Sequence, residues 1–131
     1  MPIHQRWDAE HNTLFVRFEQ PTSAEAFLVW AEALKDDTSL PAGRHEFLDL
    51  SEVETSDIKG ESLRDLADAF RGSDRTRGRT RVALLVSRDV VFGLGRMYQA
   101  YRGEGAVELE VFRDGLEARR WLDLPDDVAG A

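Results

Sequence analysis

The residues best placed to act chemically lie between Phe47 and Phe70, where a short apolar segment leads into a polar loop and then an amphipathic helix. In a parallel α/β fold, such a loop presents side chains and backbone amides at the end of a strand. Asp49 ends the apolar segment and could act as a catalytic acid or accept hydrogen bonds from loop amides. We interpret it as a structural carboxylate.

Other residue patterns that catalyse reactions or bind cofactors are not found in the sequence. His4, His11 and His45 share no metal-ligand spacing, and the lack of cysteine removes thiolate ligands and thiol nucleophiles. Gly93 and Gly95 lie within a predicted helix rather than directly after a strand, so we interpret them as allowing close approach to the sheet, not as a phosphate loop. We expect no catalytic residue, metal or cofactor, and predict that the protein is not an enzyme.

Composition limits the class of protein and its partners. A chain of 131 residues, 42% hydrophobic and 32% charged, is expected to form one domain around one core. A net charge of −8 disfavours binding to nucleic acid or to anionic lipid. No apolar run approaches the roughly 20 residues that span a bilayer, and no secretory signal is found at the start. We therefore expect a cytoplasmic protein without an integral membrane segment.

Hydrophobic periodicity predicts five strands and about four helices. Residues 3–7 and 13–18 alternate as an antiparallel hairpin does, and the apolar run Val82–Val86 predicts a strand covered on both faces. Because strands and helices then alternate, the predicted fold is α/β, with a mixed, mostly parallel five-stranded sheet in the order β-β-α-β-α-β-α-β-α. The domain is expected to span residues 1–122, with residues 123–131 as a flexible tail.

Helical spacing also predicts which side chains are buried. In the third helix, near residues 89–102, the stripe expected to face the sheet consists of Val90, Leu94, Met97 and Tyr101. The opposite side carries Phe92, Arg96 and Gln99. An aromatic beside an arginine there is typical of a partner or ligand contact, although a lone exposed ring, or a helix that starts late enough to bury it, would also account for Phe92. Elsewhere we expect buried Phe27, Trp30, Leu66, Phe70 and Leu85.

Arginines crowd the segment that follows the second predicted helix. Five of them fall from Arg71 to Arg81, and Gly72 is expected to end the helix directly after the first of them. Such a group could hold phosphate, an acidic partner or a lipid head group. A solvated loop is the alternative that we favour.

Three segments together resemble the STAS (sulfate-transporter and anti-sigma-factor-antagonist) superfamily, in its SpoIIAA-like, or STAS/SEC14-like, branch. The first reads Asp-Leu-Ser-x-Val at 49–53 with Asp-x-x-Gly at 57–60. The others are residues 82–100 and residues 111–122. The resemblance covers nearly the whole chain and implies the same element order.

The resemblance implies a non-catalytic protein-interaction module in bacterial signalling or stress regulation. Antagonists of this family carry Asp-Ser-Ser-Gly after the third strand, and a partner kinase phosphorylates the second serine. Ile58 and Lys59 stand at the serine positions here, so the resemblance implies the fold without the phosphorylation switch. The SEC14-like label implies the alternative, a carrier or sensor of a small amphipathic ligand or lipid, which needs a pocket beneath the third helix.

We predict that the partner surface combines the loop after the third strand with the third helix. Its residues are Ser56, Asp57, Lys59, Phe92, Arg96 and Gln99. Loops after parallel strands open at one edge of the sheet, and helix N-termini there favour anionic groups. The expected partner is a protein that the sequence does not identify, and a two-fold axis could also pair two third helices in a homodimer.

Overall fold

The computed structural model of the chain describes residues 3–20, 23–54 and 57–131, with the side chains of residues 73–77 left out. Its elements, in chain order, are β1 (Ile3–Asp8), β2 (Thr13–Phe18), α1 (Ala24–Asp36), β3 (His45–Leu50), α2 (Gly60–Arg77), β4 (Thr80–Val86), α3 (Asp89–Arg102), β5 (Val107–Phe112) and α4 (Gly115–Trp121). Both the predicted fold class and the predicted element order are confirmed.

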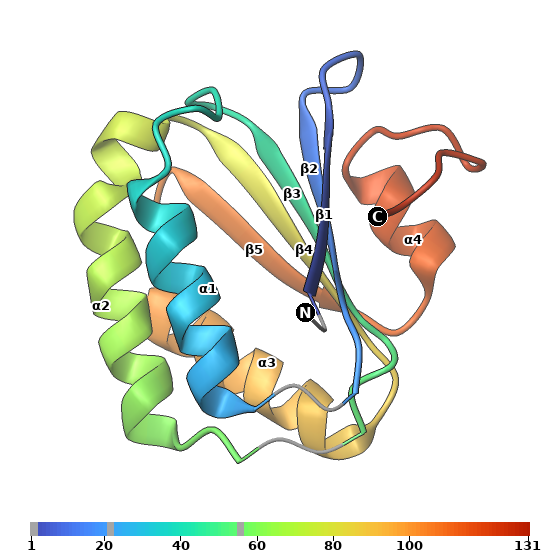
Figure 1. Ribbon diagram of the computed structural model, residues 1–131. Helices are drawn as coiled ribbons and strands as arrows, with labels where there is room; N and C mark the ends of the chain where they lie inside the picture. Colours follow the sequence, from blue (N-terminus) through green and yellow to red (C-terminus); the bar gives the residue numbers. More distant parts are fainter. Residues whose placement is uncertain (1–2, 21–22, 55–56) are drawn as a thin grey trace.

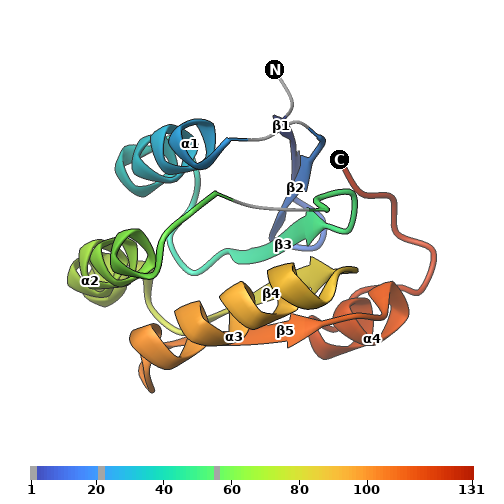
Figure 2. The same cartoon turned by 90° about the horizontal axis from the view of Figure 1, so that it is seen from below.

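The strands lie in the sheet in the same order as in the sequence, β1-β2-β3-β4-β5. β1 pairs antiparallel with β2, and the other three pairings are parallel. Each of the three crossovers connects a strand to its neighbour in the same direction across the sheet. Because such crossovers are right-handed, α1, α2 and α3 all lie on one face of the sheet. α4 covers the other face (Figures 1 and 2). No helix in the described ranges is both long and apolar enough to cross a bilayer.

Strand alternation divides the core between these two faces. In β4, Val82, Leu84 and Val86 belong to the cluster beneath α1–α3, whereas Ala83 and Leu85 belong to the cluster beneath α4. All five are buried, so the prediction of a strand covered on both faces is confirmed.

The buried side of α3 differs from the prediction by about one residue. Val91 is 6% exposed, whereas Val90 and Met97, which were expected to be buried, are 51% and 39% exposed. The reason is Gly95, where an added Cβ would lie 3.3 Å from both methyl groups of Val111. Because this glycine lets the helix backbone meet the sheet, it sets which stripe is buried. An added Cβ on Gly93 would have no atom within 4 Å, so only one of the two glycines has the predicted role.

The remaining core predictions are mostly confirmed. Leu66, Phe70 and Leu85 are buried, and Leu94 is half-buried. Phe27 and Trp30 are half-buried and pack against the cluster of Leu66 and Phe70. The predicted end of α2 at Gly72 is wrong, because the helix continues to Arg77 and ends before Gly78, whose φ of 73° suits a helix terminus. The arginine segment is therefore largely helical.

The C-terminal segment packs on the α4 face of the sheet. Leu124 is 6% exposed, and Val128 and Ala131 contact the cluster beneath α4. The Nε atoms of Arg6 and Arg17 donate to the backbone of Gly130 and Ala131 at 3.1 and 2.9 Å. The flexibility that we predicted for residues 123–131 stays a prediction, but the segment has defined contacts with β1 and β2.

The turn of the β1–β2 hairpin is held by Asp8. Its two carboxylate oxygens lie 3.2 Å from the backbone nitrogen and 2.8 Å from the Nδ1 of His11. The side-chain hydrogen bond with His11 holds the pKa of the Asp8 carboxyl below its usual value, against the opposing effect of burial.

Asp8→Asn is expected to lower the free energy of unfolding near neutral pH and to matter less in acid. Because the folded-state pKa of Asp8 is depressed, its carboxylate stabilises the fold above the unfolded pKa of about 3.9. That contribution is lost as the pH falls through the folded-state pKa. Urea unfolding from about pH 6 to about pH 3 measures the difference, with exposed Glu10→Gln as the control. A pH-independent difference would contradict this role.

Candidate functional site

Asp49 is a structural carboxylate, as interpreted from the sequence. One of its oxygens accepts hydrogen bonds from the backbone nitrogen and the hydroxyl of Ser51, at 2.9 and 2.5 Å. This local turn directs the chain away from β3, and Val53 follows at 5% exposure.

The loop after β3 reaches across to the start of α1. Asp57 accepts a hydrogen bond of 2.7 Å from the backbone nitrogen of Ala24, one of the free donors in the first turn of that helix. Lys59 is exposed, and Gly60 is close enough to α3 that an added Cβ would lie 3.4 Å from the Met97 sulfur. Ser56, also predicted for the site, lies outside the described residues.

The α3 residues of the predicted surface face the β5 edge of the sheet. The Arg113 guanidinium lies 4.5 Å from the centre of the Phe92 ring, which also packs against the core. Gln99 Nε2 donates to the Leu109 carbonyl at 2.7 Å, and so protects an edge-strand oxygen. Arg96 is exposed. Phe92 is therefore a half-buried packing residue rather than a freely exposed aromatic.

The structure does not bring the two halves of the predicted surface together. Gly60, next to Lys59, lies against Met97, whereas Phe92 and Gln99 lie on the β5 side of α3. At 100° per residue, Met97 is about 140° around the helix from Phe92. The start of α2 contacts Met97, which is eight residues after Asp89. At 1.5 Å per residue, this contact is about 12 Å along the axis of α3 from the start of that helix. The loops after β3 and β4 do meet at the carboxyl edge of the sheet, where Glu54 and Arg88 pair at 3.4 Å, but the start of α2 is displaced along α3 from the start of that helix.

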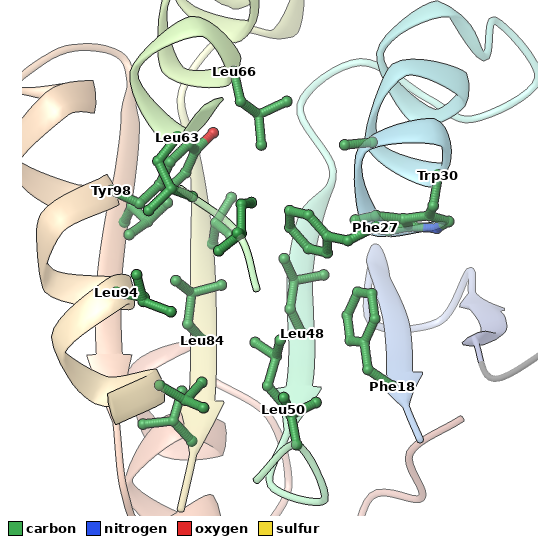
Figure 3. A pocket seen from close by; sticks show the side chains of 18 of the residues that line it. Phe18, Phe27, Trp30, Leu48, Leu50, Leu63, Leu66, Leu84, Leu94 and Tyr98 are labelled. Atoms are coloured by element: carbon green, nitrogen blue, oxygen red, sulfur yellow. The ribbon is translucent and has the colours of Figure 1, made fainter. Parts of the chain in front are cut away.

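A cavity of about 130 Å³ lies between the sheet and α1–α3 (Figure 3). Its floor consists of alternate strand residues, which point to the helical face in adjacent register: Phe18, Leu48, Leu50, Val82, Leu84 and Val86. Leu48 and Leu84 are Cα partners across β3 and β4. The floor is therefore apolar along most of its length.

The walls of the cavity come from all three helices. Phe27 and Trp30 of α1 approach from one side, and Leu94 of α3 approaches from the other (Figure 3). Leu63 and Leu66 of α2 close it between them. An aromatic cluster stabilises the α1 side, since Trp30 meets Phe18 edge-to-face with ring centres 5.1 Å apart.

One end of the cavity is polar. Glu46 and Arg102 both line it, although they are only 3% and 7% exposed. Arg44, which is 6% exposed, places its guanidinium 3.1 Å from the Glu46 carboxylate. An apolar cavity with a small polar region is the usual composition of a site for small molecules.

The sequence analysis named a pocket beneath the third helix only as a requirement of the SEC14-like alternative, and it did not predict which residues line it, because they have the types and spacing of an ordinary core. The sequence feature that could have indicated the site is Glu46, a charged residue at a helix-facing position of the apolar strand β3. Buried carboxylates are rare unless they are paired, so Glu46 indicated a polar feature inside the fold.

Two other polar clusters in the described part of the chain are weaker candidates for a functional site. A polar depression at the ends of β3 and β4 is lined by Ser51, Glu52, Glu54, Ser87 and Arg88, with an exposed Glu54–Arg88 pair at 3.4 Å. Asp8, Glu10 and His11 bring three oxygen or nitrogen atoms within 4.8 Å of one another, as a metal site could. The Asp8 carboxylate, however, already bonds His11 and faces Arg6 at 3.7 Å.

Comparison of the chain with known protein families, with curated proteins and with solved structures finds no match.

Proposed function

We propose that this domain binds a small molecule with an apolar body in the cavity between the sheet and α1–α3. The observation that carries the proposal is the cavity itself, about 130 Å³ with mainly aliphatic and aromatic walls. An engineered cavity of about 150 Å³ with Leu, Ile and Phe walls stays dry and binds benzene. A single ring or a short hydrocarbon chain is therefore the size of ligand that fits.

Energetics favour an occupant. At about 24 cal/mol per Å³, an empty cavity of this size costs the fold about 3 kcal/mol. A ligand that fills it recovers dispersion contacts that the surrounding side chains otherwise lack. Binding would therefore raise the free energy of unfolding with the logarithm of ligand concentration, as RT ln(1 + L/Kd), where L is the free ligand concentration.

This function corresponds to the carrier or sensor that the SEC14-like resemblance implies, and membership of the STAS/SpoIIAA-like family stays part of the proposal. The alternative function, protein interaction through the predicted composite surface, has less support. Lys59 and Phe92 lie on different sides of α3, so one partner contact would not readily include both.

Leu84→Phe is expected to abolish binding of benzene and toluene while leaving stability unchanged or higher, because the larger side chain fills the cavity. Leu85→Phe is the matched control. Leu84 and Leu85 are 8% and 9% exposed, but only Leu84 lines the cavity. On the packed face, Leu85→Phe should cost about 1–3 kcal/mol through overpacking, and binding should remain.

Binding is measured by titration calorimetry and by the shift in Tm with ligand concentration. A saturating probe at 100 times its Kd should stabilise wild-type protein by about 2.7 kcal/mol. If neither probe binds wild-type protein, or if both variants lose binding equally, the proposal fails.

A further inference from the structure

We propose that the ligand of this cavity carries a carboxylate head group that binds Arg102. This inference rests on the proposed function and specifies the chemical class of its ligand. An apolar body would lie over the leucines of β3 and β4, with the head group at the buried polar end.

The topology brings Arg102 and Glu46 to the same end of the cavity. α3 connects the end of β4 to the start of β5, so it runs opposite to the strands. Arg102, its last residue, therefore lies at the amino end of the parallel strands, where Glu46 is the second residue of β3. Leu50 is four residues further along the strand, about 13 Å away at 3.3 Å per residue. The cavity is thus elongated, with its polar groups at one end.

The polar end of the cavity is suited to a ligand group that accepts hydrogen bonds. A guanidinium has five N–H donors in a planar fork, so it can bind a ligand carboxylate in addition to any protein partner. Glu46 would repel an anion, but the Arg44 guanidinium lies 3.1 Å from its carboxylate and offsets that charge. Burial strengthens a bidentate Arg–carboxylate interaction, because little water competes for it.

The test compares four probes that share one ring and differ in head group: toluene, benzyl alcohol, benzylamine and benzoate. At pH 7, wild-type protein is expected to bind benzoate about tenfold or more tightly than toluene, because hydrogen bonds to charged groups are the stronger ones. Benzylamine should bind more weakly than benzoate.

Arg102→Met retains the unbranched stem without the charge, and should remove the preference for benzoate while toluene still binds. Arg102→Lys should give an intermediate preference, since it retains the charge without the fork. Exposed Arg88→Met is the control and should behave as wild type. The probe ranking in wild-type protein tests the inference even if a variant does not fold.

The outcomes separate this inference from the proposed function. If toluene binds but benzoate binds no better, or if benzylamine binds best, the carboxylate head group is excluded and the apolar binding site stands. If the benzoate preference persists in Arg102→Met, the head group binds elsewhere and this inference is wrong. If no probe binds, the proposed function itself fails.

Discussion

Phe15→Ala is expected to destabilise the protein by about 3–5 kcal/mol. Phe15 is 0% exposed at the centre of β2, and its side chain belongs to the closely packed cluster on the α4 face. Its ring lies 5.7 Å from that of Phe47 and 4.7 Å from the Arg6 guanidinium. Alanine would remove these contacts and leave a cavity that the strands on both sides cannot close.

Urea unfolding followed by circular dichroism measures this effect, with Phe112→Ala as the control. Phe112 belongs to the same cluster but is only half-buried on the edge strand β5, so its loss should cost less. Phe15→Leu should give an intermediate cost and covers the case in which the alanine variant does not fold. A smaller cost for Phe15→Ala than for Phe112→Ala would contradict the assignment of the packed face.

Glu46→Gln is expected to cost about 3–5 kcal/mol, as the loss of one member of a buried ion pair usually does. Glutamine preserves the shape of the side chain but removes the charge opposite Arg44, which is 6% exposed. The guanidinium would keep the Pro41 carbonyl, 3.2 Å from its Nη1, and a neutral amide oxygen in place of the carboxylate. Its buried charge would then be poorly compensated.

A double-mutant cycle measures this pair. Glu46→Leu combined with Arg44→Met should recover most of the stability lost in Glu46→Gln, because replacing both charges by apolar groups is often neutral or stabilising. If Glu46→Gln costs less than about 1 kcal/mol, the value typical of exposed pairs, the buried pair does not stabilise this end of the fold.

Local patterns in the sequence predicted most of the elements and their ends. Ser23 and Asp114, residue types that favour N-cap positions, directly precede α1 and α4: Ser23 Oγ accepts from the Ala26 nitrogen at 3.1 Å, and Asp114 Oδ1 from the Leu116 nitrogen at 2.8 Å. The apolar run Val82–Val86 also predicted a strand that is covered on both faces, because side chains on both faces of the sheet are apolar in a continuous run of strand length. Each of these signals lies within a few residues of the feature that it predicts.

The buried side of α3 could not be predicted from periodicity alone. Val90, Leu94 and Met97 form a regular apolar stripe, but the position of Gly95 against Val111 decides which stripe meets the sheet. That contact joins residues from two elements, and a helical wheel contains no information about the second one. The same rotation separated Phe92 from Lys59 and so divided the predicted partner surface.

The sequence by itself determined the α/β class, the element order and the two-faced sheet, because these follow from hydrophobic period and from the handedness of crossovers. Only the tertiary structure decided where the cavity lies and what lines it. Its volume is what remains when segments as distant as Phe18 and Arg102 pack around the sheet without filling the space between them. No local sequence pattern encodes the position or volume of this cavity, since both depend on how three helices and four strands pack together.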